Sequence, residues 1–298
     1  MIAGELREGL SEGVLMWFPR LSAILLVTAA ALATPVMAVG APIYAVTMGQ
    51  LCCPARADEV IRIDSVTGVV TSVGSLSTPM YPLGLAFRGR DLYVADQVQQ
   101  VLRRIDPETA ANLGEVALAL PNGYFAAEGD LAFRRDGIGF YSDLDGLTGF
   151  DVRTGATQFI GATVDIMDGL AFNQTGVLYG YGQNTASLYT IDMRSGLATL
   201  VGPTGLGISQ TTTAGLAFSA GGTLYFNNGI RLFTLDPDSG TATLVRDTFP
   251  HGAGVSGLAF PVPEPGAVLL LLAASLVWQR GRRRSTCGHS VVRCPPHS

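Results

Sequence analysis

The tetrapeptide GLAF at Gly84–Phe87 decides the fold, because it recurs through the middle of the chain at a nearly constant interval. It returns with Asp in first place at Asp130–Phe133, and with Gly at Gly169–Phe172, Gly215–Phe218 and Gly257–Phe260. The intervals are 46, 39, 46 and 42 residues. Self-similarity at such a period indicates an architecture built from repeated structural units.

Two more motifs recur in register with the first. An apolar residue followed by Asp and a turn occurs as IDSVTG from Ile63, IDPETA from Ile105, FDVRTG from Phe150, IDMRSG from Ile191 and LDPDSG from Leu235. An apolar–aromatic pair occurs at Ile43-Tyr44, Leu92-Tyr93, Phe140-Tyr141, Leu178-Tyr179 and Leu224-Tyr225. Three motifs, each repeated five times in the same order, are not a chance pattern.

Each repeat reads as four short runs of apolar, β-branched and aromatic residues separated by turn residues, which is typical of strands. Four strands in about 40–45 residues is the period of a propeller blade. The first repeat lacks GLAF and the last motif is an isolated GLAF at Gly257–Phe260. We therefore predict an all-β protein, a five-bladed β-propeller of four-stranded blades over 42–261, in which the last strand completes the first blade and leaves no free edge there.

The recurrent polar and aromatic residues can be interpreted as structural or as functional. In LYTIDMRSGLATLVG, Asp192 is expected to accept backbone N–H groups in a turn, and Gly196 to adopt a positive φ. Metal binding by these Asp residues is the competing interpretation. The five Phe residues that end the GLAF motifs are expected to pack between blades, whereas an exposed Tyr would offer a stacking platform for sugars.

The first 38 residues are predicted to be a signal peptide. Leu21–Ala33 is an apolar block of the length of a signal core, Arg20 precedes it, and small residues favour cleavage after Ala38. Cleavage after Ala41 and an uncleaved anchor are alternatives, and Met16 is a plausible start.

The C-terminal region holds three features in order. Val262–Pro265 is Val-Pro-Glu-Pro, Gly266–Trp278 is apolar, and an Arg cluster follows at Arg280, Arg282, Arg283 and Arg284. By the positive-inside rule the cluster stays in the cytoplasm. The order resembles the PEP-CTERM sorting signal, with a membrane helix, over 262–284; a simple membrane anchor is the alternative. The resemblance implies recognition of Pro263, Glu264 and Pro265 by an exosortase, and export to the surface or extracellular matrix of a Gram-negative bacterium. The tail 285–298 departs from that pattern, because such proteins usually end soon after the cluster.

Composition excludes several classes of function. The chain is 48% hydrophobic and 14% charged, which is unlike a disordered protein. All 19 cationic residues are Arg, and 42–261 contains 12 Arg against 20 acidic residues, a net charge of −8. We therefore expect no nucleic-acid partner. His251 is the one histidine of this domain, so a Ser-His-Asp or Cys-His site would have to use it.

The loops before GLAF and after the apolar–aromatic pair share one face of a propeller, where a ligand is expected. Polar residues there that do not recur are Asp96, Glu128, Asp143, Asp145, Asp165, Asp168, Asn184, Asn227, Asn228 and His251. From these we predict ligand contacts at Asp96, Glu128, Asp168, Asn184 and Asn227. Asp143-Leu144-Asp145-Gly146 suggests Ca²⁺ binding through Asp143 and Asp145, although it lacks the remaining ligands of an EF-hand loop. A solvated turn is the alternative, and no other cofactor is expected.

The repeat pattern resembles YVTN-type surface propellers and gluconolactonase-like proteins, with Leu92–Asp96 (LYVAD) as the nearest local match. The second resemblance implies a metal shell of carboxylates and Asn, for which Glu128, Asp168 and Asn184 are candidates. Cys52 and Cys53 are adjacent, Cys287 and Cys294 follow the apolar block, and none has a zinc or redox spacing. A surface disulfide between Cys52 or Cys53 and another chain is possible.

These observations predict a non-enzymatic surface or matrix protein that binds an extracellular polysaccharide or a surface protein. The alternative is a metal-dependent, gluconolactonase-like hydrolase or lyase, which requires several of the loop carboxylates and Asn residues to converge. A structural surface protein with no specific ligand is the third possibility.

Overall fold

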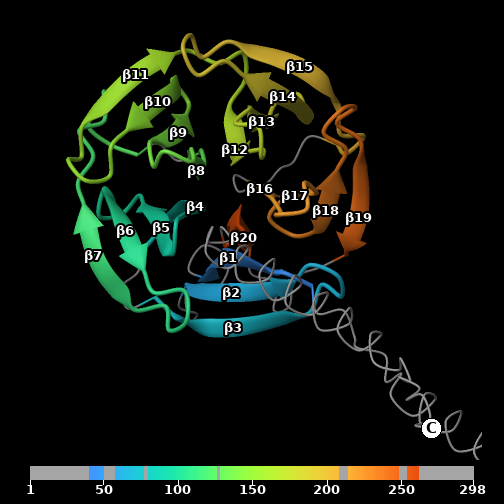
Figure 1. The fold of residues 1–298 in the computed structure, drawn as a ribbon, viewed down its shortest axis with the longest axis horizontal. Helices are drawn as coiled ribbons and strands as arrows, with labels where there is room; N and C mark the ends of the chain where they lie inside the picture. The colour runs from blue at the N-terminus through green and yellow to red at the C-terminus, as the bar shows by residue number, and fades with distance from the viewer. Residues whose placement is uncertain are drawn as a thin grey trace, which may run out of the picture. The chain divides into compact units, whose positions relative to one another are not determined.

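The computed structural model describes residues 40–49, 58–76, 80–125, 128–207, 214–247 and 254–261. All belong to the unit Gly40–Ser298. They form twenty β-strands in five antiparallel four-stranded sheets. Figure 1 shows the sheets arranged as blades around a central axis, which confirms the five-bladed propeller. The predicted signal peptide, sorting signal and tail lie outside the described residues.

The blades, from the axis outward, have the following strands. Blade 1 contains β20 (Gly254–Ala259), β1 (Pro42–Met48), β2 (Glu59–Asp64) and β3 (Val70–Ser75). Blade 2 contains β4 (Pro82–Arg88), β5 (Asp91–Asp96), β6 (Val101–Ile105) and β7 (Asn112–Val116). Blade 3 contains β8 (Leu131–Phe133), β9 (Gly139–Asp143), β10 (Gly146–Phe150) and β11 (Thr157–Gly161). Blade 4 contains β12 (Met167–Phe172), β13 (Leu178–Gly182), β14 (Ser187–Ile191) and β15 (Ala198–Pro203). Blade 5 contains β16 (Gly215–Phe218), β17 (Leu224–Asn227), β18 (Leu232–Leu235) and β19 (Ala242–Arg246).

The ring closes within blade 1. The last strand, β20, pairs antiparallel with the first, β1, and Tyr44 lies opposite Ala259. The prediction that the isolated GLAF strand completes the first blade is therefore confirmed. This pairing covers strand edges that both ends of the repeat region would otherwise expose.

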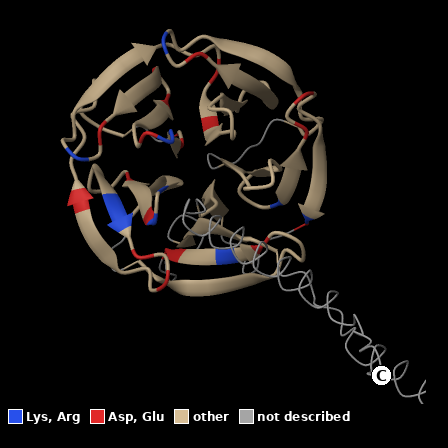
Figure 2. Cartoon of the chain, in the orientation of Figure 1, with Lys and Arg blue, Asp and Glu red and all other residues tan. Residues whose placement is uncertain are grey.

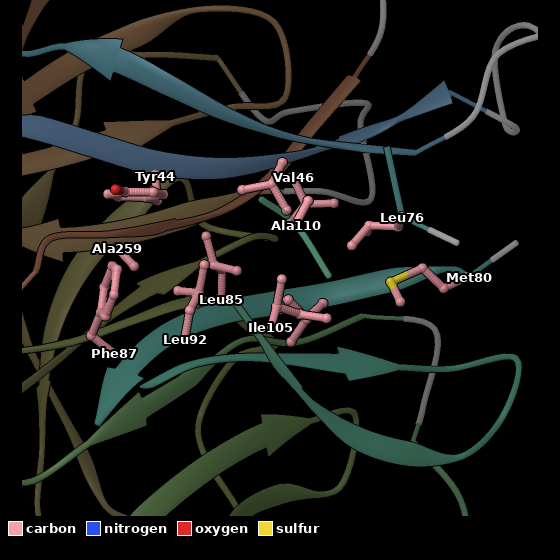
Figure 3. Packing of buried hydrophobic residues seen from close by; sticks show 12 residues of the cluster. Tyr44, Val46, Leu76, Met80, Leu85, Phe87, Leu92, Ile105, Ala110 and Ala259 are labelled. Atoms are coloured by element: carbon pink, nitrogen blue, oxygen red, sulfur yellow. The ribbon is translucent and has the colours of Figure 1, made fainter. Parts of the chain in front are cut away.

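The core lies between the blades rather than in a single centre. Inner strand β4 is buried along almost its whole length, whereas outer strand β7 is largely exposed. Inner strands are buried because neighbouring blades cover both of their faces. Each of the five interfaces has its own apolar cluster. Figure 3 shows the cluster between blades 1 and 2, where Tyr44, Phe87 and Leu85 meet.

An aromatic contact crosses every blade interface. The ring of Phe87 lies 5.2 Å from that of Tyr44 and nearly perpendicular to it, at 78°. The other pairs are Tyr93–Phe133, Phe140–Phe172, Tyr179–Phe218 and Tyr225–Phe260. The expected packing role of the recurrent Phe residues is confirmed, and edge-on geometry of this kind adds to the burial of the rings.

The third repeat corrects the sequence alignment by one residue. Leu92 lies opposite Phe87 in blade 2, but Gly139 lies opposite Phe133 in blade 3. The apolar–aromatic pair of blade 3 is therefore Gly139-Phe140, and not Phe140-Tyr141. A Cβ at Gly139 would lie 2.1 Å from the ring of Phe150, so this ring fills the space that a leucine side chain occupies elsewhere.

Within the described ranges, no helix is long and apolar enough to cross a membrane.

Candidate functional site

The two ends of the ring differ in the segments that form them. We call the "loop face" the end formed by connections from the second to the third strand of a blade and from the fourth strand to the next blade. The "turn face" is the opposite end, formed by the tight turns between first and second and between third and fourth strands. Strand alternation in an antiparallel sheet places every connection on one face or the other.

Asp residues cap the turns of the turn face, as predicted. The Asp192 carboxylate accepts the N–H of Arg194 at 2.7 Å, and Gly196 adopts a φ of 75°. The corresponding carboxylates of the other blades accept backbone N–H groups of their own turns in the same way: Asp64, Asp106, Asp151 and Asp236. Their recurrence is therefore explained by turn geometry.

The loop face contains the buried acids. Figure 2 shows most charged positions in the connections around the ring, with an acidic position on inner strand β12. In the described part of the chain, the buried acidic residues are all on the loop-face side: Asp58, Asp96, Asp130, Asp143, Asp165 and Asp168. The buried acids therefore lie on the face where a ligand is expected from the sequence.

Four of the non-repeated residues act as caps of loop-face connections. Asp96 accepts the N–H groups of Val98 and Gln99 and forms a doubly bonded ion pair with buried Arg103, at 2.7 and 2.8 Å. Asn227, fully buried, accepts the N–H of Gly229. The other two are Asp165, which binds the 183–185 connection, and Asn228, which accepts the N–H groups of Ile230 and Arg231. Folding therefore already uses Asp96 and Asn227, two of the predicted ligand residues.

The predicted Ca²⁺ pair lies in a two-residue turn between β9 and β10. One oxygen of Asp143 accepts the N–H groups of Asp145 and Gly146, and the Asp145 carboxylate meets the side chain of Asn122. Burial raises the pKa of Asp143, and the two turn N–H groups oppose that rise. Among the described residues, no three His, Cys, Asp or Glu side chains gather closely enough to hold a metal. Ca²⁺ at Asp143 and Asp145 stays a prediction.

Asn184 and Glu128 lie at different depths on this face. Asn184 is exposed at the tip of the β13–β14 connection, where its backbone N–H binds Asp165. Glu128 is half-buried, next to inner strand β8, and its charge acts on Asp168. The structure therefore associates Glu128 with Asp168 and places Asn184 on a hairpin tip.

Asp130 occupies the axis of the propeller. It stands where four other repeats have Gly, and it is completely buried. Its two carboxylate oxygens accept the N–H of Leu131 at 2.8 Å and that of Leu170, in the next blade, at 2.9 Å. Burial raises its pKa well above the ordinary value, and N–H groups of Leu170, Leu131, Leu216 and Leu85 oppose this. The sequence analysis missed this residue, although its signal was the single Asp in the GLAF series.

Asp168 lies one residue nearer the loop face, on β12, and has a different environment. It is 1% exposed, and its Oδ2 has no hydrogen-bond partner. Burial raises its pKa well above the ordinary value, the charges of Asp130 and Glu128 raise it further, and backbone N–H groups of Gly129 and Ala214 oppose the rise. A buried carboxylate oxygen without a partner is uncommon and requires an explanation.

Tyr181 shares this environment. It is buried, and burial together with the charges of Asp168 and Asp165 raises its pKa to about 12. Its hydroxyl therefore stays protonated at neutral pH and can act only as a neutral hydrogen-bonding group. His251 and the four cysteines lie outside the described residues.

The described architecture defines the chain as a five-bladed β-propeller. No protein-family model matches it, and no curated protein is similar to it in sequence. Among solved structures, it resembles a chain of a nidogen/laminin complex (14% identity, TM-score 0.51, 75% of this chain and 99% of that one). It also resembles a gluconolactonase of Xanthomonas campestris (17%, 0.47, 74% and 79%) and virginiamycin B lyase of Staphylococcus aureus (14%, 0.40, 62% and 61%). Similarity at this level shows the propeller fold alone.

Proposed function

We propose that the loop face binds its ligand at the axis, through Asp168 and Glu128, and that the protein is a metal-dependent hydrolase or lyase. One observation carries the proposal: the buried Oδ2 of Asp168, which has no hydrogen-bond partner. A buried carboxylate with a strongly perturbed pKa and an unused oxygen is a candidate for a functional site. This reverses the order of the two functions expected from the sequence, in which the enzyme was the alternative.

The residues at the axis fit a hard divalent cation in part. Asp168 has a carboxylate oxygen to donate, and Asp130 and Glu128, in that order, are the acids whose charges act on it. Asp130 does not fit, because N–H groups occupy both of its oxygens. Asp168 and Glu128 would hold the ion, with backbone or water oxygens completing the six to eight ligands that Ca²⁺ prefers. A bound ion would supply Lewis-acid polarisation of a substrate carbonyl.

The loop face also carries exposed apolar side chains in the connections around the ring. Val98, Leu144 and Ile230 are exposed at three hairpin tips of the loop face, and Tyr124 and Val164 are exposed in its longer connections. Apolar side chains around a central polar group are the usual lining of a small-molecule site. We therefore expect a substrate with an apolar or weakly polar body and one carbonyl group, such as a cyclic ester.

Calcium titration tests the site before any substrate is known. Thermal unfolding of the full chain is measured with and without CaCl₂, for the parent, Asp168→Asn and Glu128→Gln. Asp238→Asn, an exposed acid on the turn face, is the control for charge. The site is supported if Ca²⁺ raises the Tm of the parent and of Asp238→Asn but not that of Asp168→Asn or Glu128→Gln. An equal rise in Tm in all four proteins contradicts it.

Activity is then measured as acid release from a lactone in a pH-stat, with and without EDTA. Turnover that EDTA and Asp168→Asn both abolish supports the hydrolase. Calcium binding without turnover on lactones or candidate lyase substrates favours the second candidate.

The second candidate is an exported binding module, and the exposed apolar residues of the loop face favour it. Among the described residues, five exposed apolar residues lie on this end of the ring, and the turn face has four: Val66, Val69, Val177 and Leu197. A partner surface on the loop face is therefore the hypothesis that a binding measurement must test. Binding of the full chain to the exopolysaccharide of its own producer is the measurement, with Tyr124→Ala as the loop-face variant and Phe159→Ala, on outer strand β11, as its control. Loss of binding in the Tyr124 variant alone would support this function.

The proposed location is the surface or extracellular matrix of a Gram-negative bacterium. Its support is the C-terminal order of Pro263-Glu264-Pro265, apolar block and Arg cluster, with exosortase and the membrane as the implied partners. Cell fractionation of Glu264→Ala against the parent tests it. Retention of the variant in the inner membrane is expected, and unchanged release would contradict sorting through this motif.

A further inference from the structure

At the first position of the GLAF motif, the inner strands of neighbouring blades approach one another so closely that little or no space is left for a side chain. A Cβ at Gly215 would lie 2.5 Å from the backbone carbonyl carbon of Gly257, and one at Gly257 would lie 2.6 Å from the backbone nitrogen of Leu85. The GLAF glycines are therefore required by contact between backbones of neighbouring blades. Only Gly257 has a positive φ among them, at 63°.

The same contacts bring backbone N–H groups together. Each GLAF glycine lies against the backbone nitrogen of the leucine in the next blade: Gly84 against Leu131, Gly169 against Leu216, Gly215 against Leu258, and Gly257 against Leu85. Leu170, in blade 4, donates its N–H to Asp130. A ring of converging N–H groups is a concentration of partial positive charge, and such nests bind anions.

Asp130, directly before inner strand β8, has its side chain in this ring. Its Oδ1 would lie 2.5 Å from a Cβ at Gly84, so the carboxylate occupies the space beside that glycine. It accepts N–H groups from its own blade and from the next, and those of Leu216 and Leu85 add weaker interactions. Its partners thus come from four of the five blades.

We propose that the centre of the ring is an anion site made of backbone N–H groups, and that Asp130 occupies it as a built-in ligand. The ligand class is a small carboxylate, because the ring is filled by one carboxylate group with its two oxygens. Occupation from within the chain ties four inner strands together and closes the axis below Asp168. The inference uses other residues than the proposed catalytic site and stands if that function fails.

Chemical rescue tests the anion site. Asp130→Gly restores the GLAF sequence of the other blades and vacates the ring, while Asp130→Asn keeps it filled with an uncharged side chain of the same size. Thermal unfolding of the full chain is measured with sodium formate against formamide, at constant ionic strength in a bulky buffer. Formate at about 100 times its Kd should raise the Tm of the Gly variant by about 5–10 °C.

The controls decide between rescue and a general salt effect. The parent and Asp130→Asn should show no formate-specific shift, because their rings are filled. An equal shift in all three proteins, no shift in Asp130→Gly, or an Asp130→Gly variant as stable as the parent without formate would overturn the proposal. If Asp130→Gly does not fold in buffer, refolding yield replaces Tm: recovery only with formate supports the site, and no recovery with either additive overturns it.

Discussion

The two faces of the propeller use the same side chain for the same local task under opposite conditions of burial. On the turn face, Asp192 and Asp236 are exposed while they cap their turns. On the loop face, Asp96 and Asp143 also accept the N–H groups that follow them, but they are buried. A carboxylate costs little where water still solvates it and a great deal where it does not. The loop face is therefore where a change of one acid has large consequences.

Asp96→Ala is expected to have the largest effect. It removes the carboxylate oxygen that accepts the N–H groups of Val98 and Gln99, and it leaves Arg103, which is 3% exposed, with Glu115 as its remaining carboxylate partner. Breaking a buried ion pair from one side should lower the free energy of unfolding by about 3–5 kcal/mol. Urea unfolding measures it. The double variant Asp96→Ala/Arg103→Leu should lose less than Asp96→Ala alone, and a larger loss in the double variant would contradict this account.

The acids of the two faces should also have opposite effects on how the free energy of unfolding depends on pH. Burial raises the folded-state pKa of Asp168, and the charges of Asp130 and Glu128 raise it further, so the folded chain holds a proton that the unfolded chain has released. Asp168 therefore contributes stability that is complete below the ordinary Asp pKa and is lost as pH rises through the raised pKa, at up to about 1.4 kcal/mol per pH unit. Urea unfolding in EDTA from about pH 4 upward should show this decline.

Turn-face acids supply the contrast. Hydrogen bonds from Thr67 lower the pKa of Asp64, and hydrogen bonds from Arg153 lower that of Asp151. Their contribution is present above the ordinary Asp pKa and is lost as pH falls through the lowered values. A slope that Asp168→Asn leaves unchanged above the ordinary pKa would show that Asp168 is not one of the groups responsible.

Asp236→Ala should have a smaller effect, because its cap is exposed. The Asp236 carboxylate accepts the N–H of Asp238 at 2.8 Å, and water can replace it. The expected loss is about 1 kcal/mol in urea unfolding, the net value of one hydrogen bond. A loss as large as that of Asp96→Ala would remove burial as the explanation for the difference between the faces.

Asp168→Asn is expected to have the smallest effect on folding. Its amide oxygen can still accept the N–H groups of Gly129 and Ala214, and the buried charge disappears. In EDTA at about pH 8, the free energy of unfolding should change by less than about 1 kcal/mol, while the Ca²⁺-dependent shift is lost. A large loss of stability without any effect on Ca²⁺ would assign Asp168 a structural role.

The site was less predictable than the fold, because residues that do not recur carry no period to interpret. Asp96 and Asn227 looked available for a ligand in the sequence, yet both are caps of the connections that follow them. Asp130 counted only as a variant of the GLAF motif, since nothing local reveals that its side chain meets four blades. The alignment of blade 3 was wrong by one residue because the ring of Phe150 substitutes for a leucine that the repeat should contain.

The sequence by itself determined the blade number, the strand order within a blade and the closure of the ring. These follow from local chemistry, since strand periodicity, Asp-capped turns and glycine positions repeat five times and reinforce each other. Only the tertiary structure decided which acids are structural and which is left with an unused oxygen. Burial and hydrogen-bond satisfaction depend on contacts at the axis between segments about 40 residues apart, as between Asp130 and Leu170. A local sequence pattern does not predict such contacts.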